Sequence, residues 1–178
     1  EELMPRNEGI KGENITFGVL TSEKDFGKGR GARGILNTWG KELKNIYFAT
    51  DEENPDERFI KLTSHRDLAS NCEKQLKLII HLVEKYPETE WYALVDDDTF
   101  IYADNLIEFL DNKETPMPVC YGYMMSLWPG DKDLVHPSGG AGYILNRHAA
   151  KLVSNALQTL KSLKTYPHWK DEFDTIHP

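Results

Sequence analysis

Residues 91–98 read Trp-Tyr-Ala-Leu-Val-Asp-Asp-Asp, an apolar run that ends in three consecutive aspartates. The run predicts a buried strand whose end brings several carboxylates into one small volume. Like charges this close repel one another and raise their own pKa values unless something neutralises them. The common neutraliser is a divalent cation held by carboxylate oxygens, with phosphate oxygens of a ligand completing its shell. A solvated acidic loop is the alternative, but such a loop seldom follows an apolar strand, so the stretch predicts a metal-dependent site for a phosphorylated molecule.

The size and charge of the chain limit its class. With 178 residues it is expected to form a single domain, spanning 1–178, with a sizeable core. Its net charge of −8 argues against nucleic-acid binding, which uses a basic surface. No apolar stretch approaches the roughly 18 residues that span a bilayer, and no signal peptide heads the chain. Because the chain begins at Glu1 rather than Met, we expect it to be cut from a longer parent, with any anchor outside it.

The two cysteines, Cys72 and Cys120, lack the C-x-x-C spacing of zinc sites, which argues against structural zinc. They are either two buried free thiols or one disulfide, and both alternatives stay open. Asn14–Ile15–Thr16 is an N-glycosylation sequon, which by itself is weak support for a secretory compartment.

The pattern of apolar residues predicts strands that alternate with helices. An amphipathic helix is expected over 72–85, where Leu76, Ile79, Ile80 and Val83 repeat at helical spacing. The other expected elements are strands at 15–20, 45–50, 59–62, 91–95 and 118–125, a helix beginning within 24–34, a short helix around 106–110 with Asp104 as N-cap, and a last helix over 147–163. This order indicates an α/β fold with a largely parallel sheet.

In open parallel sheets, ligands bind at the carboxyl ends of the strands. Thr21, Asp51 and the three aspartates each follow an expected strand. We therefore expect them to contribute to one shared site.

Three motifs carry a resemblance to a known family: Asp96–Asp97–Asp98–Thr99–Phe100, Ser138–Gly139–Gly140–Ala141–Gly142–Tyr143 and Ile35–Leu36–Asn37–Thr38–Trp39–Gly40. In this order and spacing they resemble the Fringe and core-1 galactosyltransferase-like family of β1,3-glycosyltransferases, which is glycosyltransferase family 31-like. The resemblance covers roughly residues 15 to 160. It implies a GT-A fold with a mainly parallel central sheet flanked by helices, a UDP-sugar donor, dependence on Mn²⁺ and inversion at the anomeric carbon.

The resemblance also implies roles for particular residues. Asp98 would bind the metal that bridges the two phosphates of the donor, Asp97 would contact the ribose or donor sugar, and Asp96 would support the cluster. The wider set of expected donor-binding residues is Thr21, Arg30, Arg33, Asp51, Asp96 and Asp97. Lys74 or Lys77 is a further candidate for reaching the donor.

On the acceptor side, the Gly-rich stretch lets the backbone approach a sugar closely because glycine adds no bulk. Trp128 and Tyr143 would either stack on a sugar ring or pack in the core. The set expected to bind acceptor or sugar is Trp128, Gly139, Gly140, Ala141, Gly142 and Tyr143.

An inverting transfer needs a carboxylate that removes the proton of the acceptor hydroxyl. Asp174 lies at about the distance from Gly139 in the sequence that the resemblance implies for this base. Asp171 and Glu172 are the alternatives. No residue matches the family's metal-binding histidine, since His177 comes too early. The chain is then either a truncated enzyme or a minimal relative with altered chemistry.

The resulting hypothesis is a Mn²⁺-dependent glycosyltransferase that moves a hexose or N-acetylhexosamine from a UDP-sugar to a glycan or glycoprotein acceptor. By resemblance it would work in the Golgi or secretory lumen and meet a membrane only through an anchor that this chain lacks. A non-catalytic relative that binds a nucleotide sugar or glycan is the main alternative. A phosphatase with a D-x-D-G-T motif is a weaker one, because Thr99 follows Asp98 with no glycine between them.

Overall fold

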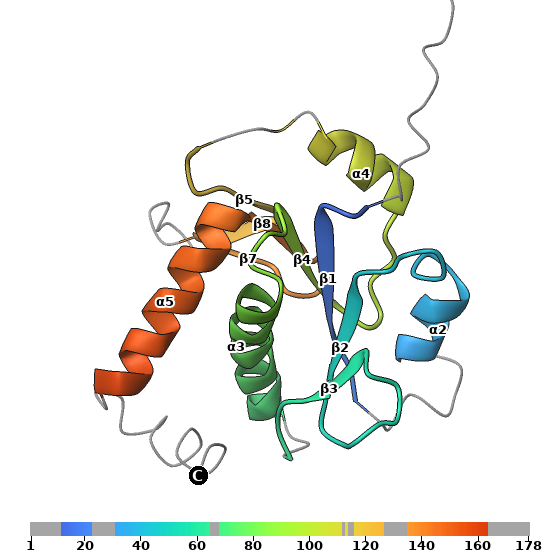
Figure 1. The fold of residues 1–178 in the computed structure, drawn as a ribbon, viewed down its shortest axis with the longest axis horizontal. Coiled ribbons are helices and arrows are strands. Elements are labelled where there is room, and N and C mark those ends of the chain that lie inside the picture. The colour runs from blue at the N-terminus through green and yellow to red at the C-terminus, as the bar shows by residue number, and fades with distance from the viewer. Residues whose placement is uncertain are drawn as a thin grey trace, which may run out of the picture.

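A six-stranded sheet with strand order β3-β2-β1-β4-β8-β5 forms the centre of the protein (Figure 1). The computed structural model describes residues 12–22, 31–64, 68–111, 113, 116–126 and 135–163. The strands are β1 (Ile15–Leu20), β2 (Ile46–Thr50), β3 (Phe59–Lys61), β4 (Trp91–Asp96), β5 (Cys120–Gly122) and β8 (Tyr143–Asn146). The first four in chain order pair in parallel, whereas β8 runs antiparallel to both β4 and β5. The expected α/β class with a mainly parallel sheet is therefore confirmed.

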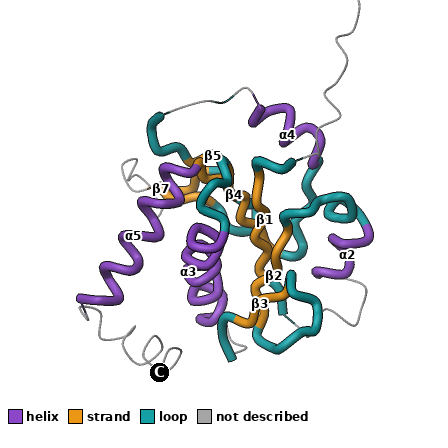
Figure 2. The backbone as a smooth tube through the Cα atoms, viewed as in Figure 1, coloured by secondary structure: helices purple, strands orange, loops and turns teal. Residues whose placement is uncertain are grey.

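Helices cover both faces of this sheet (Figures 1 and 2). They are α2 (Gly31–Asn37), α3 (Leu68–Lys85), α4 (Ala103–Asp111) and α5 (Arg147–Leu163). Buried residues of α2 and α4 belong to the hydrophobic core on one face, and those of α3 and α5 belong to the core on the other. Among the described residues, no helix combines the length and the apolar character needed to cross a membrane.

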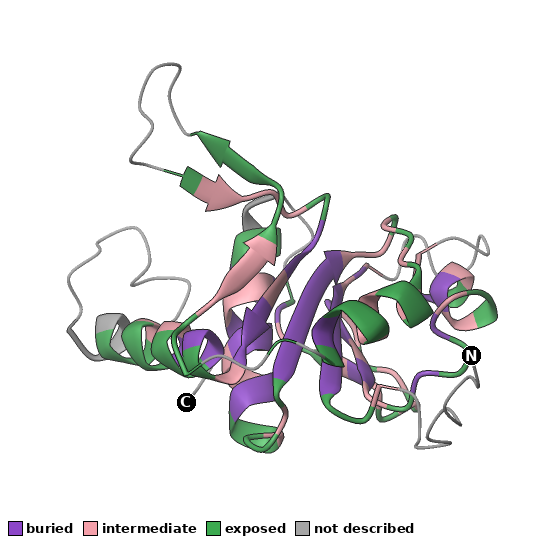
Figure 3. Cartoon of the chain, turned by 90° about the horizontal axis from the view of Figure 1, so that it is seen from above, coloured by how far each residue is buried: buried purple, intermediate pink, exposed green. Residues whose placement is uncertain are grey.

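The strands are buried on both faces because their residues alternate between these two cores. In β1 and β4, Phe17 and Ala93 point to the α2–α4 side, whereas Tyr92 and Leu94 point to the α3–α5 side. Side chains along a strand alternate with period two, and a central parallel strand is apolar on both faces. Figure 3 shows the resulting band of buried residues through the middle of the molecule.

Helix α3 packs directly on the backbone of β1 at Gly18. A Cβ atom at that position would lie only 2.8–2.9 Å from side-chain atoms of Leu78, Leu82 and Leu94. Any larger residue here would force these leucine side chains to shift, so glycine permits the close approach of α3 to β1.

The buried face of α3 differs from the expected one. Its fully buried apolar residues are Leu78, Ile79, Leu82 and Val83, whereas the expected Leu76 and Ile80 are only half-buried. The helix is covered by the sheet and also contacts α5, so its buried face is wider than a single apolar stripe.

Three further predictions need correction. The expected strand at 118–125 is two short strands in different sheets, β5 and β6 (Met124–Ser126), and β6 pairs with β7 (Val135–Pro137) as an exposed ribbon that projects from the body in Figure 3. Asp104 is not an N-cap but lies in the first turn of α4. Its negative charge there interacts favourably with the helix dipole. Cys72 is exposed and Cys120 half-buried, and both are free, which contradicts the disulfide and the full burial alike. The single-domain assignment stays a prediction.

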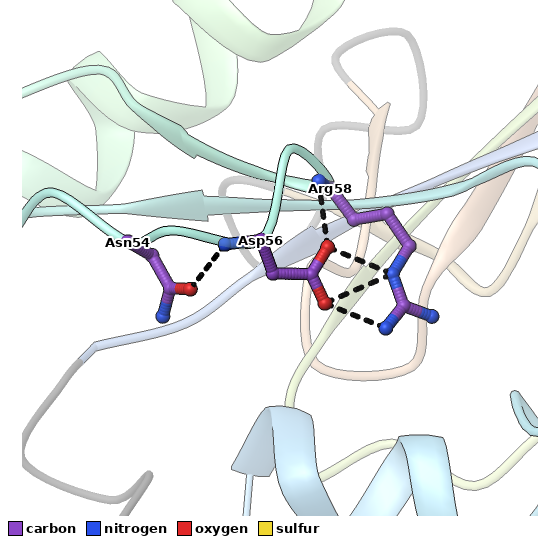
Figure 4. Close-up of polar contacts among 3 residues, drawn as sticks. All are labelled: Asn54, Asp56 and Arg58. Carbon is purple, nitrogen blue, oxygen red and sulfur yellow. Dashed lines mark hydrogen bonds and ion pairs between the residues drawn. The ribbon is translucent and has the colours of Figure 1, made fainter.

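The acidic loop between β2 and β3 has a defined structure. The Arg58 guanidinium donates from Nη2 to Asp56 Oδ2 at 2.6 Å and from Nε to Asp56 Oδ1 at 3.0 Å, and the Asp56 N–H donates to Asn54 Oδ1 at 2.9 Å (Figure 4). The side-chain hydrogen bond from Arg58 holds the pKa of Asp56 below its ordinary value. The loop therefore follows the carboxyl end of β2 as an ordered turn.

Replacing Arg58 by alanine is expected to lower the free energy of unfolding by no more than about 1 kcal/mol, because both partners are about one-third exposed. A carboxyl whose folded pKa is depressed stabilises the fold above its unfolded pKa and loses that effect as the pH falls through its folded pKa. Urea unfolding at pH 7 and pH 3 measures this, with the exposed Lys44→Ala as control. An equal loss at both pH values would contradict the assignment.

Candidate active site at the carboxyl edge of the sheet

The three aspartates form a turn at the carboxyl end of β4. Asp96 is the last residue of the strand, Asp96 and Asp97 are half-buried, and Asp98 is exposed. The backbone N–H of Thr99 donates to the Asp96 carbonyl oxygen at 3.1 Å, which closes the turn. Asp98 is thus the most exposed of the three aspartates.

The end of the neighbouring strand β1 contacts this turn. Leu20 pairs with Asp96 in the parallel ladder, so Thr21 arrives beside the aspartates. The Thr21 hydroxyl donates to Asp97 Oδ2 at 2.6 Å. This bond orients one carboxylate of the cluster and places Thr21 where the sequence predicted it.

Asp51 follows β2, which lies on the other side of β1 (Figure 1), and it is buried. Its charge acts on Lys74 of α3, as do the charges of Asp97 and Asp96. Asp51 therefore lies in the same electrostatic environment as the aspartate turn. The structure brings these predicted residues together at one edge of the sheet.

Lys74 is a buried cation of this environment. Its side chain is only 3% exposed, and Nζ donates to the Thr21 carbonyl oxygen at 2.9 Å. Burial lowers the pKa of Lys74, whereas the charges of Asp51, Asp97 and Asp96 raise it. The sequence named Lys74 and Lys77 together, and the structure separates them: Lys77 forms an ion pair with Glu73 and donates to the Leu62 carbonyl.

The pKa of Asp96 is raised, first by its own burial and then by the charges of Asp98 and Asp97, against a lowering by Lys74. The repulsion that the run of aspartates predicted therefore contributes at Asp96, although burial is the larger cause.

The Gly-rich loop lies against the aspartate turn. Thr99 Oγ1 donates to the Gly140 carbonyl at 3.0 Å, and a Cβ on Gly140 would be 3.9 Å from Asp96 Oδ2. Gly142 has φ = +77°, and a Cβ there would lie 2.8 Å from Val95 Cγ1, so this position requires glycine. A Cβ on Gly139 would have no neighbour within 4 Å, which leaves its backbone open.

Tyr143 occupies the core instead of facing this loop. It is 8% exposed, belongs to the α3–α5 core, and its hydroxyl accepts a hydrogen bond from Gln75 Nε2 at 2.9 Å. Of the two alternatives, stacking on a sugar or packing, the structure shows packing. Burial is the main reason that the pKa of Tyr143 is raised.

For the other expected site residues, no contact with the cluster is established. Arg33 is exposed on α2. The residues Arg30, Trp128, Asp171, Glu172 and Asp174 lie outside the described residues. The expected catalytic base therefore stays a prediction.

The sequence analysis did not name Gln75, and it named Trp39 only as part of a motif, without its contact to the aspartate turn. Trp39 Nε1 donates to the Thr99 carbonyl at 3.2 Å and so holds the far side of the turn. Gln75 supports Tyr143, which follows the Gly-rich loop. No local pattern marks either contact, since each joins residues more than 50 positions apart.

The carboxylates of the aspartate turn fit a cation that is also bound by oxygen atoms of a substrate. Within the described ranges, no three His, Cys, Asp or Glu side chains converge as a complete metal site. The accessible carboxylate of Asp98, next to Asp97, instead resembles sites where one or two carboxylates and the phosphates of a substrate share the metal. The arrangement suits a hard divalent ion bound together with a diphosphate.

Residues 10–171 match the family described as Fringe-like. The chain is also similar to glycoprotein-N-acetylgalactosamine 3-beta-galactosyltransferase 1 of Xenopus laevis, at 38% identity over 117 residues. Those residues are 65% of this chain and 31% of the relative, so the chain matches about a third of that protein's length.

Proposed function

The chain belongs to the Fringe-like family, and on that premise we propose that it is the catalytic region of an inverting, Mn²⁺-dependent glycosyltransferase. It would move a hexose or N-acetylhexosamine from a UDP-sugar to a hydroxyl of a glycan or glycoprotein, in β1,3 linkage. The flanked, mainly parallel sheet is the GT-A class of fold expected for this family. The observation that carries the proposal is the meeting of Thr21, Asp97 and Lys74 at the carboxyl edge of that sheet.

Different residues at this edge would bind the metal and the donor. Asp98 would hold the metal, and its exposure leaves it accessible to a diphosphate. A Mn²⁺ ion held by Asp98 would neutralise the charge that develops on the departing nucleoside diphosphate. Thr21 fixes the Asp97 carboxylate, which would accept hydrogen bonds from hydroxyls of the ribose or donor sugar.

The remaining groups position the reactants. The open backbone at Gly139 and Gly140 provides space for a sugar beside Asp96. Asp174, with Asp171 and Glu172 as alternatives, would remove the acceptor proton as the bond forms. A Golgi or secretory location accords with Asn14 of the sequon, which is exposed.

Isothermal titration of UDP into the chain, with and without Mn²⁺, tests the donor site. We expect binding that depends on Mn²⁺ and that Asp98→Ala weakens at least about tenfold, because a ligand to the metal is lost. Asp111→Ala, an exposed aspartate at the end of α4, is the matched control and should bind as the native chain does.

Binding of UDP that is indifferent to Mn²⁺, or equal in Asp98→Ala, would contradict the proposal. Hydrolysis of a simple aryl phosphate would favour the phosphatase alternative. Mn²⁺-dependent UDP binding by a longer chain that transfers no sugar would favour the non-catalytic relative.

A further inference from the structure

A recess of about 390 Å³ opens directly beside the aspartate turn, on the α2–α4 face of the sheet. Its volume lies within the range of roughly 300–1,000 Å³ that is typical of small-molecule sites. Thr99 and Gly142 line it, and both also border the candidate donor site. The recess therefore adjoins that site through these two residues.

The rim of the recess is aromatic and exposed. Phe100 is 62% exposed, Tyr102 73% and Tyr123 68%. The rings of Phe100 and Tyr102 meet edge to face, with centroids 5.4 Å apart and planes at 75°. Aromatic side chains gathered in the open beside a cavity are typical of binding surfaces.

The floor, by contrast, is held firmly. Tyr121 lies half-buried there, and its ring packs against Trp91 at 5.8 Å and against Phe109 at 5.3 Å. The segment that carries Phe100 is anchored at Thr99, whose backbone carbonyl accepts from Trp39 and whose hydroxyl donates to Gly140. The backbone that leads into Phe100 is thus anchored beside the aspartate turn.

The chemistry of the lining selects its occupant. None of the described residues that line the recess carries a charge. A diphosphate or a charged peptide would gain no ion pair there, whereas a neutral sugar ring has a face of C–H groups and a rim of hydroxyls. The C–H face of the sugar packs on aromatic faces, and its hydroxyl groups form hydrogen bonds with tyrosine hydroxyls.

We propose that this recess binds a neutral pyranose ring of the acceptor glycan, with Phe100 and Tyr102 as its stacking surface. The term acceptor rests on the proposed function, whereas the binding of a neutral sugar does not. Tyr143 also borders the recess but is only 8% exposed, so this assignment places acceptor recognition on the exposed aromatic residues that follow the aspartate turn.

Saturation-transfer NMR with a panel of neutral methyl glycosides, those of galactose, N-acetylgalactosamine, glucose and fucose, tests the proposal without any donor. We expect the native chain to bind at least one of them. Phe100→Ala and Tyr102→Ala should weaken that binding about tenfold, whereas Tyr102→Phe should retain most of it because the ring remains. Leu152→Ala removes an exposed apolar side chain on α5, away from the recess, and should change nothing.

Failure of the native chain to bind any glycoside, or equal binding by Phe100→Ala and Tyr102→Ala, would overturn the proposal. The UDP titration is run on the same variants and should be unchanged in them, since neither side chain is assigned to the donor. Sugar binding that depends on Phe100, in a chain that fails to bind UDP with Mn²⁺, would contradict the donor half of the proposed function and still support the recess.

Discussion

Replacing Lys74 by methionine is expected to lower the free energy of unfolding by about 3 kcal/mol at pH 7, because it removes the buried cation from a cluster of carboxylates. The charges of Asp51, Asp97 and Asp96 all act on Lys74. The Thr21 carbonyl also loses its hydrogen bond from Nζ. Methionine keeps most of the length of the side chain, so the loss reports charge and hydrogen bonding more than volume.

The sign of the pH dependence follows from Asp96. Its pKa is already raised in the native protein, and Lys74 opposes that rise. Without Lys74 the pKa of Asp96 rises further. The loss of stability in Lys74→Met is therefore largest while the carboxylates are ionised. It should shrink as the pH falls through the folded pKa of Asp96. Guanidinium unfolding at pH 7 and pH 4 measures the difference.

Two control variants make this result specific. Lys74→Arg keeps the charge and should recover part of the stability. Lys85→Met removes an exposed lysine from the last turn of the same helix and should cost less than about 0.5 kcal/mol. A Lys74→Met protein as stable as the native one would contradict the role of Lys74 as the cation of the site.

Replacing Gly18 by valine is expected to lower the free energy of unfolding by about 3 kcal/mol or to prevent folding. A Cβ at Gly18 would already lie 2.8–2.9 Å from Leu78, Leu82 and Leu94, and valine adds two more carbons. Overpacking of this kind typically costs about 1–3 kcal/mol because the side chains leave their preferred rotamers. Gly18→Ala should show a smaller loss in the same direction.

Gly139→Ala is the matched control for this series. A Cβ at Gly139 would meet nothing within 4 Å, so stability should stay within about 0.5 kcal/mol of the native value. Equilibrium urea unfolding, followed by circular dichroism, measures all three variants. Equal stability of the Gly18→Val and Gly139→Ala proteins would contradict the packing of α3 on β1.

The parallel part of the fold was predictable because the strands are apolar on both faces and end in polar residues. The strand at 15–20 and the helix at 147–163 were predicted to the residue. The break after Gly122 was not, because the run from 118 to 125 has no internal stop in its hydrophobicity. Its division depends on pairing with β8 on one side and β7 on the other.

For the site, the sequence indicated residues that follow strands, such as Thr21 and Asp51, since parallel strands deliver their ends to one edge. It did not separate Lys74 from Lys77, because both lie on the polar-apolar boundary of one helix. Only the crossing of α3 over Gly18 decides which of them reaches the aspartates. The sequence also left open whether Tyr143 is buried, because its burial depends on which helix packs against its strand.

The residues that meet at the carboxyl edge are far apart along the chain, and this has a consequence for folding. Thr21 and Asp97 are joined by a hydrogen bond across 76 positions, and Lys74 reaches Thr21 across 53. Contacts of such long range form only after several loops have closed, which slows the folding of a chain. No partly folded state that lacks the pairing of β1 with β4 contains the site. A molecule that binds there selects the fully assembled sheet, and by mass action it protects every strand of that sheet from unfolding.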